Sequence, residues 1–274
     1  MQRAFKKLRR EDARLDNDSA PGQIEQPPVQ QLEGRSSPLK TNNLGLRQLW
    51  APDHPSTAIA DVVFLHGLTG DSYRTWLHQS SGIHWPSTFL CQDIPDVRIL
   101  AFGYDADVVN SWSAAGQDRV GTHAQNLLSS LADKRDETES TERPIIVVGH
   151  SLGGLVAANA LNITRYSTLK HISNVGQHIR AMLFLGTPHY GSDLAAWAAL
   201  GTRIASTLKH TNKAIVNLLE RDSEVLAGIQ DGFAHALESR KERGQPIVIS
   251  CFIESKPVSG IGLVCTGALP LTWI

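Results

Sequence analysis

The sequence predicts an α/β protein whose mostly parallel sheet is covered by helices on both faces. Three observations carry this prediction. Several short apolar runs are uninterrupted by polar residues, which is typical of strands buried on both sides. Segments with the 3.6-residue period of helices lie between those runs, as alternating α/β folds require. One run ends in a serine flanked by glycines, directly before a helix-like segment.

Five apolar runs bounded by turn residues are expected to form buried strands. In chain order they are residues 60–67, 96–104, 143–151, 178–188 and 246–255. Helices are expected over residues 121–137, 153–161 and 211–244. The first expected helix carries Leu127, Leu128 and Leu131 at helical spacing, and the last ends at Gly244, because glycine commonly terminates a helix.

The chain is expected to contain three parts. Residues 1–45 are rich in Pro, Gln, Ser and Asn, and bury too little apolar surface to offset the entropy of ordering, so they are predicted to be a disordered tail. Residues 46–264 are predicted to form the α/β domain, and residues 265–274 an atypical, truncated C-terminal tail.

The first fifteen residues, MQRAFKKLRREDARL, are basic and leave two interpretations open. The segment is either a solvated flexible tail or a helix for membrane-surface binding or organelle targeting. Glu11, Asp12 and Asp16 favour the tail, because transit peptides contain few acidic residues.

The composition argues against several classes of protein. The 274 residues carry a formal net charge of −1, so no overall basic field favours nucleic acid as a partner. Cys91, Cys251 and Cys265 lie far apart, in no pattern typical of metal sites or disulfide frameworks. The longest apolar runs fall well short of the roughly 20 residues that a membrane span needs. We therefore expect no metal, no other cofactor, no transmembrane segment and a cytoplasmic location.

The segment VVGHSLGG, residues 147–154, has the pattern of a nucleophile elbow. Such a serine occupies a sharp turn between strand and helix, and Gly149 and Gly153 leave out side chains that would collide across that turn. Ser151 Oγ would then be exposed at the C-terminal edge of the sheet and beside a helix N-terminus, where free N–H groups favour developing negative charge. Ser151 is the predicted nucleophile.

A second turn supports this interpretation. The strand over residues 60–65 runs into His66, Gly67 and Leu68, at the position where hydrolases with this elbow supply an oxyanion donor. The predicted donors are the N–H groups of Leu68 and Leu152. His66, Gly67 and His150 are expected to shape the pocket around them, and His66 is not the predicted general base.

With these motifs in place, the chain resembles an α/β-hydrolase, and more narrowly the serine-esterase and lipase-like family that includes the serine-active-site-containing proteins. The resemblance rests on VVFLHGLTGDSYRTW, ILAFGYDADV, IIVVGHSLGGLV, LFLGTPHYGSDLAAW, DSEVLAGIQDGF and CFIESKPVSGIG, which together span most of residues 46–264. It implies an intracellular hydrolase of carboxylic esters, lipid or acyl esters in particular, with peripheral association to mitochondrial or endoplasmic reticulum membranes.

The remaining members of the triad are harder to place. In this fold the acid follows a late strand, and both position and family pattern favour Glu254; Asp193 and Asp222 are weaker alternatives. No histidine follows Glu254. His189 follows an expected strand at the active-site edge and is predicted to line the pocket.

Four other histidines follow Ser151 in or beside helical segments and are expected at the surface: His171, His178, His210 and His235.

The prediction is therefore a serine esterase domain with an intact elbow and no evident base. Since a serine hydroxyl without a base is a weak nucleophile, two alternatives stay open. One is a catalytically impaired module that binds acyl groups or partners. The other is that the C-terminus is incomplete or altered relative to a functional protein.

Overall fold

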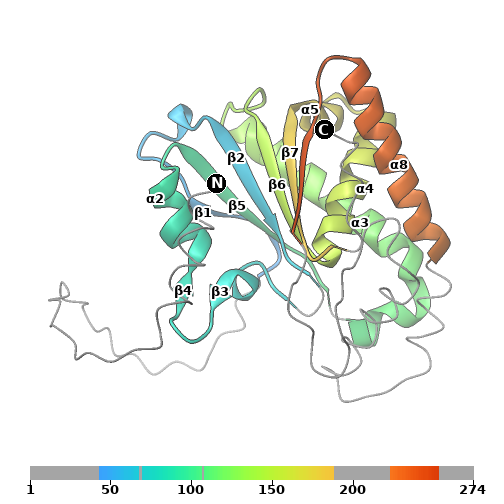
Figure 1. The fold of residues 1–274 in the computed structure, drawn as a ribbon, viewed down its shortest axis with the longest axis horizontal. Helices are drawn as coiled ribbons and strands as arrows, with labels where there is room; N and C mark the ends of the chain where they lie inside the picture. Colours follow the sequence, from blue (N-terminus) through green and yellow to red (C-terminus); the bar gives the residue numbers. More distant parts are fainter. Residues whose placement is uncertain (1–42, 68–69, 107, 188–222, 253–274) are drawn as a thin grey trace, which may run out of the picture. The chain divides into compact units, whose positions relative to one another are not determined.

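The computed structural model describes residues 43–67, 70–106, 108–187 and 223–252 (Figure 1). These residues belong to one compact unit, residues 43–274. The predicted disordered tail lies outside the described residues up to position 42, and the predicted C-terminal tail lies outside them entirely.

Six strands of the described residues form one sheet in the order β1-β5-β2-β6-β7-β8. Their bounds are Gly45–Trp50 (β1), Ala60–Leu65 (β2), Val97–Gly103 (β5), Ile145–His150 (β6), Ile179–Leu185 (β7) and Val248–Phe252 (β8). β1 pairs antiparallel with β5, and every other neighbouring pair is parallel. The predicted mostly parallel sheet is confirmed, with all five predicted strands present.

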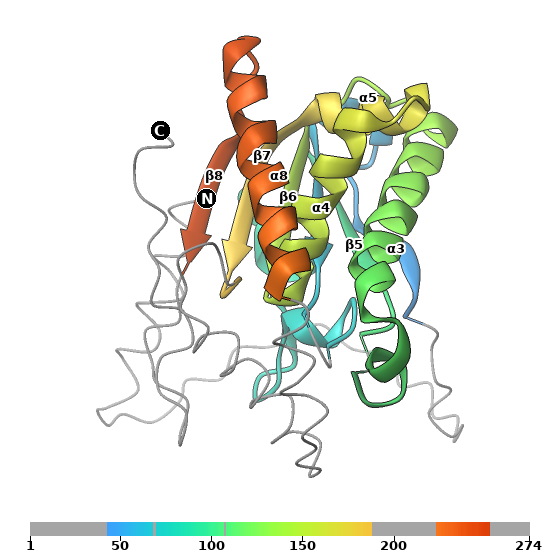
Figure 2. The same cartoon turned by 90° about the vertical axis from the view of Figure 1, so that its right-hand side faces the viewer.

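Four helices cover one face of this sheet, with α4 between α3 and α8 (Figure 2). They are α3 (Val108–Glu137), α4 (Leu152–Tyr166), α5 (Lys170–His178) and α8 (Ser223–Glu242). Gly244 has a φ of 70° and follows α8, as expected for the residue that ends this helix.

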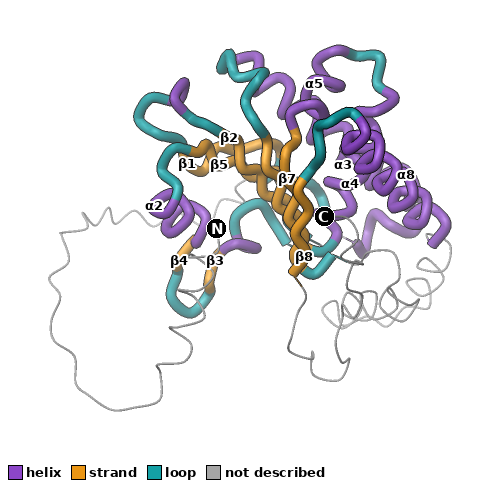
Figure 3. Tube along the Cα trace, turned by 45° about the horizontal axis from the view of Figure 1, so that its top comes forward, coloured by secondary structure: helices purple, strands orange, loops and turns teal. Residues whose placement is uncertain are grey.

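The opposite face is covered by the chain between β2 and β5 (Figure 3). This excursion contains short elements: the helical turns η2 (Arg74–Trp76), η3 (Pro86–Leu90) and α2 (Cys91–Asp93), and the small hairpin of β3 (Leu77–His78) and β4 (Ile83–His84). A further turn, η1 (Pro55–Thr57), precedes β2.

Alternate side chains of β2 supply the two layers of the core. Val63 and Leu65 pack with the large helices, whereas Val62 and Phe64 pack with the η2–α2 excursion. A strand with both faces covered needs apolar residues on both faces, which explains the uninterrupted run Val62–Leu65 in the sequence.

Two details of the sequence prediction were wrong. β8 is not buried on both faces: Val248 is 64% exposed and Phe252 40% exposed. β8 lies at an end of the strand order and pairs with β7 alone among the described strands, so apolar composition did not imply burial. His178 is not a surface residue: it is 9% exposed and its Nε2 lies 3.1 Å from a Glu142 carboxylate oxygen.

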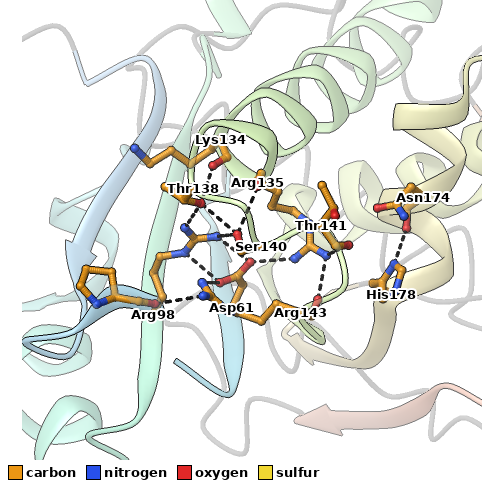
Figure 4. A network of polar contacts seen from close by, with 11 residues as sticks. Asp61, Arg98, Lys134, Arg135, Thr138, Ser140, Thr141, Arg143, Asn174 and His178 are labelled. Carbon is orange, nitrogen blue, oxygen red and sulfur yellow. Dashed lines mark hydrogen bonds and ion pairs between the residues drawn. The ribbon is translucent and has the colours of Figure 1, made fainter. Parts of the chain in front are cut away.

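A buried charge network joins the starts of the central strands (Figure 4). Asp61, near the start of β2, accepts two hydrogen bonds of 2.8 Å from Arg98 of β5. Arg135, near the end of α3, donates a third at 2.8 Å, and Arg143, just before β6, a fourth at 3.2 Å. Hence one carboxylate ties together three strands and a helix.

Candidate active site

The order of the strands locates the site before any side chain is considered. From β2 the chain crosses to β5 on one side, and from β5 it returns to β6 on the other side of β2. In open α/β sheets, ligands bind beyond the carboxyl ends of strands where the order reverses in this way. The residues that follow β2 and β6 are His66–Gly67 and Ser151.

Ser151 occupies a strained turn between β6 and α4. Its backbone has φ 52° and ψ −120°, a conformation that side-chain-bearing residues rarely adopt. Its N–H donates to the Leu185 carbonyl of β7 at 2.9 Å, and its carbonyl accepts from the Gly154 N–H at 3.0 Å. The predicted position of Ser151, at a strand–helix corner on the C-terminal edge, is confirmed. Strain of this kind costs about 1–3 kcal/mol and is concentrated at functional sites.

The glycines around Ser151 are required by close packing. A Cβ at Gly149 would lie 2.6 Å from the Cα of Gly154, across the turn. A Cβ at Gly153 would lie 2.5 Å from the carbonyl oxygens of Leu65 and His66, at the end of β2. Both neighbours are backbone atoms that cannot rotate away, so the glycine spacing seen in the sequence reflects a tight contact between α4 and the end of β2.

His66 and Gly67 form the second turn of the site. His66 is 1% exposed; its Nδ1 lies 2.9 Å from the Gly67 carbonyl, and its Nε2 accepts from the Tyr104 N–H at 3.2 Å. Burial lowers the pKa of His66 below 6.5, so the ring is neutral at neutral pH. The proton must then sit on Nδ1, because Nε2 is an acceptor. These contacts fit the predicted role of His66 as a residue that shapes the turn.

Gly67 lies directly against the elbow. A Cβ at Gly67 would lie 2.8 Å from Ser151 Cβ and 2.9 Å from His150 Nδ1. The ring of half-buried His150 meets Trp76 edge-on, with the centroids 6.3 Å apart. The structure therefore brings together His66, Gly67, His150 and Ser151, four of the residues predicted for the site.

The two predicted oxyanion donors differ in what the structure describes. Leu152 is the first residue of α4, and the N–H groups of a first helical turn have no acceptor within the helix. They also carry the positive end of the helix dipole. Leu68 lies outside the described residues. The roles of both groups stay predictions.

The predicted acid and the pocket histidine are also outside the described residues. Glu254 follows β8 by two residues, and β8 lies two places from β6 in the sheet, as predicted for the acid-bearing strand. His189 comes two residues after Thr187, the last described residue of that segment. Asp193, Asp222 and His210 likewise lie outside.

Three histidines after Ser151 are described, and none is placed as a base. His171 and His235 are exposed on α5 and α8. His178 ends α5 directly before β7 begins, which puts it at the opposite edge of the sheet from Ser151.

Sequence reasoning missed two residues of the site. Tyr104 follows β5, and its hydroxyl donates to the His66 carbonyl at 2.5 Å. Trp76 packs against Phe64 of β2, with ring centroids 4.9 Å apart, and reaches His150 from η2. Tyr104 could have been predicted from the sequence, because it ends an apolar run expected to form a parallel strand. The carboxyl ends of parallel strands lie at the same edge of the sheet, so Tyr104 is expected at the edge where Ser151 lies. Trp76 could not be placed, because it lies in an excursion without periodicity.

Two other kinds of feature are absent from the described residues. Within them, no three or more His, Cys, Asp or Glu side chains are gathered so as to hold a metal ion. No helix among them combines the length and apolar character needed to cross a membrane.

The strand order, the serine at a positive-φ corner and the glycine contacts define an α/β-hydrolase fold with a nucleophile elbow. Residues 60–225 match the family described as "Putative serine esterase (DUF676)", and the chain belongs to this family. The resemblance stated from the sequence is thereby confirmed.

The chain is also similar to longer proteins. Protein SERAC1 of Homo sapiens is 28% identical over 216 residues, covering 72% of this chain and 30% of that protein. Protein SERAC1 of Danio rerio is 25% identical over 204 residues, covering 66% and 29%. The match thus spans less than a third of these relatives. Among solved structures, a lipase/esterase from Lactobacillus plantarum gives a TM-score of 0.41 at 13% identity, over 75% of this chain and 84% of that one.

Proposed function

We propose that this chain is a serine esterase domain in which Ser151 is the nucleophile. The main observation in support is the backbone conformation of Ser151, which has a φ of 52° at the C-terminal edge of the sheet, with glycines packed around it. A chain that used this corner only as a connection would gain nothing from the strain. In the proposed reaction, Ser151 Oγ bonds to the ester carbonyl carbon, the C=O π electrons move onto the oxygen, and the N–H groups of Leu152 and Leu68 stabilise this oxyanion. The C–O bond to the alcohol then breaks, the alcohol leaves with the serine proton, and water hydrolyses the acyl-serine to free Ser151 and the acid.

The same proposal makes Glu254 the acid and leaves the base unassigned. None of the described histidines after Ser151 is placed as a base, and general-base assistance is worth roughly 10²- to 10⁴-fold in rate. We therefore expect slow hydrolysis of activated esters. His189 is proposed as a pocket residue and not as the base.

The direct test is labelling by a fluorophosphonate, which reacts with activated serines. The wild-type chain should be labelled at Ser151, and Ser151→Ala should abolish labelling. Ser129→Ala, at an exposed position of α3, is the matched control and should be labelled like the wild type. Labelling that persists in Ser151→Ala would remove the nucleophile from the proposal.

No described histidine after Ser151 is placed as a base, which favours a second candidate, a module that binds acyl groups without turnover. Added imidazole distinguishes the two. If the elbow is functional and lacks only a base, imidazole should raise the rate of ester hydrolysis above that seen with Ser151→Ala under the same conditions. If the site only binds, both proteins should show the same rate, that of imidazole in buffer.

Substrate class and location are proposed on the family resemblance alone. We propose a lipid or acyl ester as substrate and peripheral contact with mitochondrial or endoplasmic reticulum membranes inside the cell. Flotation of the chain with anionic vesicles, compared with neutral ones, tests the membrane contact. Recovery of the protein only in the bottom fraction with both kinds of vesicle would contradict it.

A further inference from the structure

We propose that Tyr104 is a positioning residue of the site: it fixes the His66–Gly67 turn, which packs directly against Ser151. The inference rests on the proposed esterase function. It adds a third strand to the site, because Tyr104 follows β5, whereas the turn follows β2 and Ser151 follows β6.

Tyr104 holds His66 by three separate contacts. Its hydroxyl donates to the His66 carbonyl at 2.5 Å, and its backbone N–H donates to His66 Nε2 at 3.2 Å. The two rings also stack, with centroids 4.2 Å apart and planes at 15°. Tyr104 is only 6% exposed, so water gives little competition for its hydroxyl. Both the backbone and the side chain of His66 are therefore fixed by the same residue.

The effect of these contacts extends to the next peptide. With Nε2 accepting from Tyr104, the proton of His66 lies on Nδ1 and donates to the Gly67 carbonyl at 2.9 Å. That carbonyl also accepts from the Gly70 N–H at 3.2 Å. Two hydrogen bonds thus hold the Gly67 carbonyl in place. Gly67 is also the residue that lies against the elbow, since a Cβ there would be 2.8 Å from Ser151 Cβ.

The electrostatics keep this arrangement in one protonation state at neutral pH. Burial lowers the pKa of His66, and His123 and His150 lower it further, while the Gly67 carbonyl and Asp71 oppose the shift. Burial raises the pKa of Tyr104 far above its ordinary value. Each ring is neutral, so each hydrogen bond keeps a fixed direction.

The position of Tyr104 explains why a tyrosine serves here. Gly67 is too close to Ser151 and His150 for a side chain of its own, and Gly153 abuts the His66 carbonyl from α4. The turn therefore cannot be held in place by a packed side chain at Gly67 or at Gly153 of α4. The hydroxyl of Tyr104 reaches it from β5.

Tyr104→Phe tests the inference, because it removes one hydroxyl and leaves the backbone donor and the ring. We expect the maximal rate of fluorophosphonate labelling at Ser151 to fall about 10- to 100-fold, since small displacements of catalytic groups cost rates of this order. The probe concentration for half-maximal rate should stay unchanged, a split that a general loss of folding would not produce. Tyr166→Phe, at a residue 76% exposed beyond the site, is the control and should label like the wild type.

Two measurements on the turn itself, one of a backbone amide and one of the His66 ring, separate this inference from the proposed function. Amide exchange at Gly70 should speed up in Tyr104→Phe, because its acceptor is no longer held. In the wild type, nitrogen chemical shifts of His66 should report a neutral ring protonated at Nδ1. The second measurement needs no variant, so it stands even if Tyr104→Phe fails to fold.

The outcomes are distinct. If Ser151→Ala abolishes labelling but Tyr104→Phe labels at the wild-type maximal rate, the inference is wrong and the proposed function stands. If the wild type is not labelled, the proposed function fails. If amide exchange at Gly70 is unchanged in Tyr104→Phe, Tyr104 does not fix the turn, and the inference is wrong as well. A His66 ring protonated at Nε2 would also overturn it.

Discussion

Asp61→Asn should destabilise the fold severely while leaving the chemistry of Ser151 intact. Asp61 is fully buried and accepts four hydrogen bonds from three arginines. Asparagine has nearly the same shape but replaces one acceptor oxygen with a donor. That donor would face guanidinium N–H groups, and buried Arg98 and Arg135 and half-buried Arg143 would lose their only carboxylate among the described ion pairs.

The size of the effect follows from the burial. Breaking a buried pair by removing one partner costs about 3–5 kcal/mol, because the other charge is left uncompensated. Burial lowers the pKa of Arg135 and the Asp61 carboxylate opposes that shift, so the remaining charge is costlier to hold after the substitution. For a domain of about 150–250 residues, the expected fall in Tm is roughly 6–20 °C.

Thermal and urea unfolding measure the loss, with Glu137→Gln as a control. Glu137 pairs with Lys134 at 2.9 Å on the surface and is 68% exposed, so its pair should contribute less than about 1 kcal/mol. Below the unfolding transition, fluorophosphonate labelling of Asp61→Asn should match the wild type. A loss of stability no larger than that of Glu137→Gln would refute the reasoning. So would impaired labelling of the folded variant.

Two further predictions concern packing and pH. Gly154→Ala should destabilise the fold by about 1–3 kcal/mol, because its Cβ would lie 2.1 Å from Thr187 Oγ1. Gly228→Ala, in open space on α8, should instead stabilise the fold by up to about 1 kcal/mol. Equal unfolding midpoints of the two variants would contradict this prediction. Burial lowers the pKa of His66 and His84 below 6.5, so the unfolded chain takes up protons first as the pH falls. Stability should therefore decrease below pH 6.5, by up to about 1.4 kcal/mol per pH unit for each histidine. Urea titrations at several pH values check this, and His84→Gln should flatten the slope.

The strands of the sheet could be predicted well because a strand that is buried on both faces is visible in the sequence as a continuous apolar run. A central strand such as β2 needs apolar residues on both of its faces, and the run Val62–Leu65 shows that need. β1 escaped prediction for the opposite reason: Gly45–Trp50 is partly exposed and carries Arg47 and Gln48, so no apolar run marks it. β8 has the composition of a central strand but a place at the end of the described strand order.

The site was predictable where glycine spacing encodes geometry and not elsewhere. Ser151 and the His66–Gly67 turn were found because tight backbone packing tolerates only glycine beside them. The buried network was missed, since Asp61, Arg98, Arg135 and Arg143 are ordinary charged residues spread over more than 80 positions, as the separation of Asp61 and Arg143 shows. Nothing local in a sequence says that such residues meet.

The two edges of the sheet are connected by register. At one edge, Asp61 binds Arg98 and Arg143, which lie at or near the starts of β2, β5 and β6. At the other edge, the same three strands end at His66, Tyr104 and Ser151. Asp61 lies opposite Arg98 in one pairing and opposite Ile145 in the other. A slip of one residue in either pairing would break the network and turn every side chain of that strand to the other face. The register in which the network forms is therefore the same register in which His66, Tyr104 and Ser151 meet at the site.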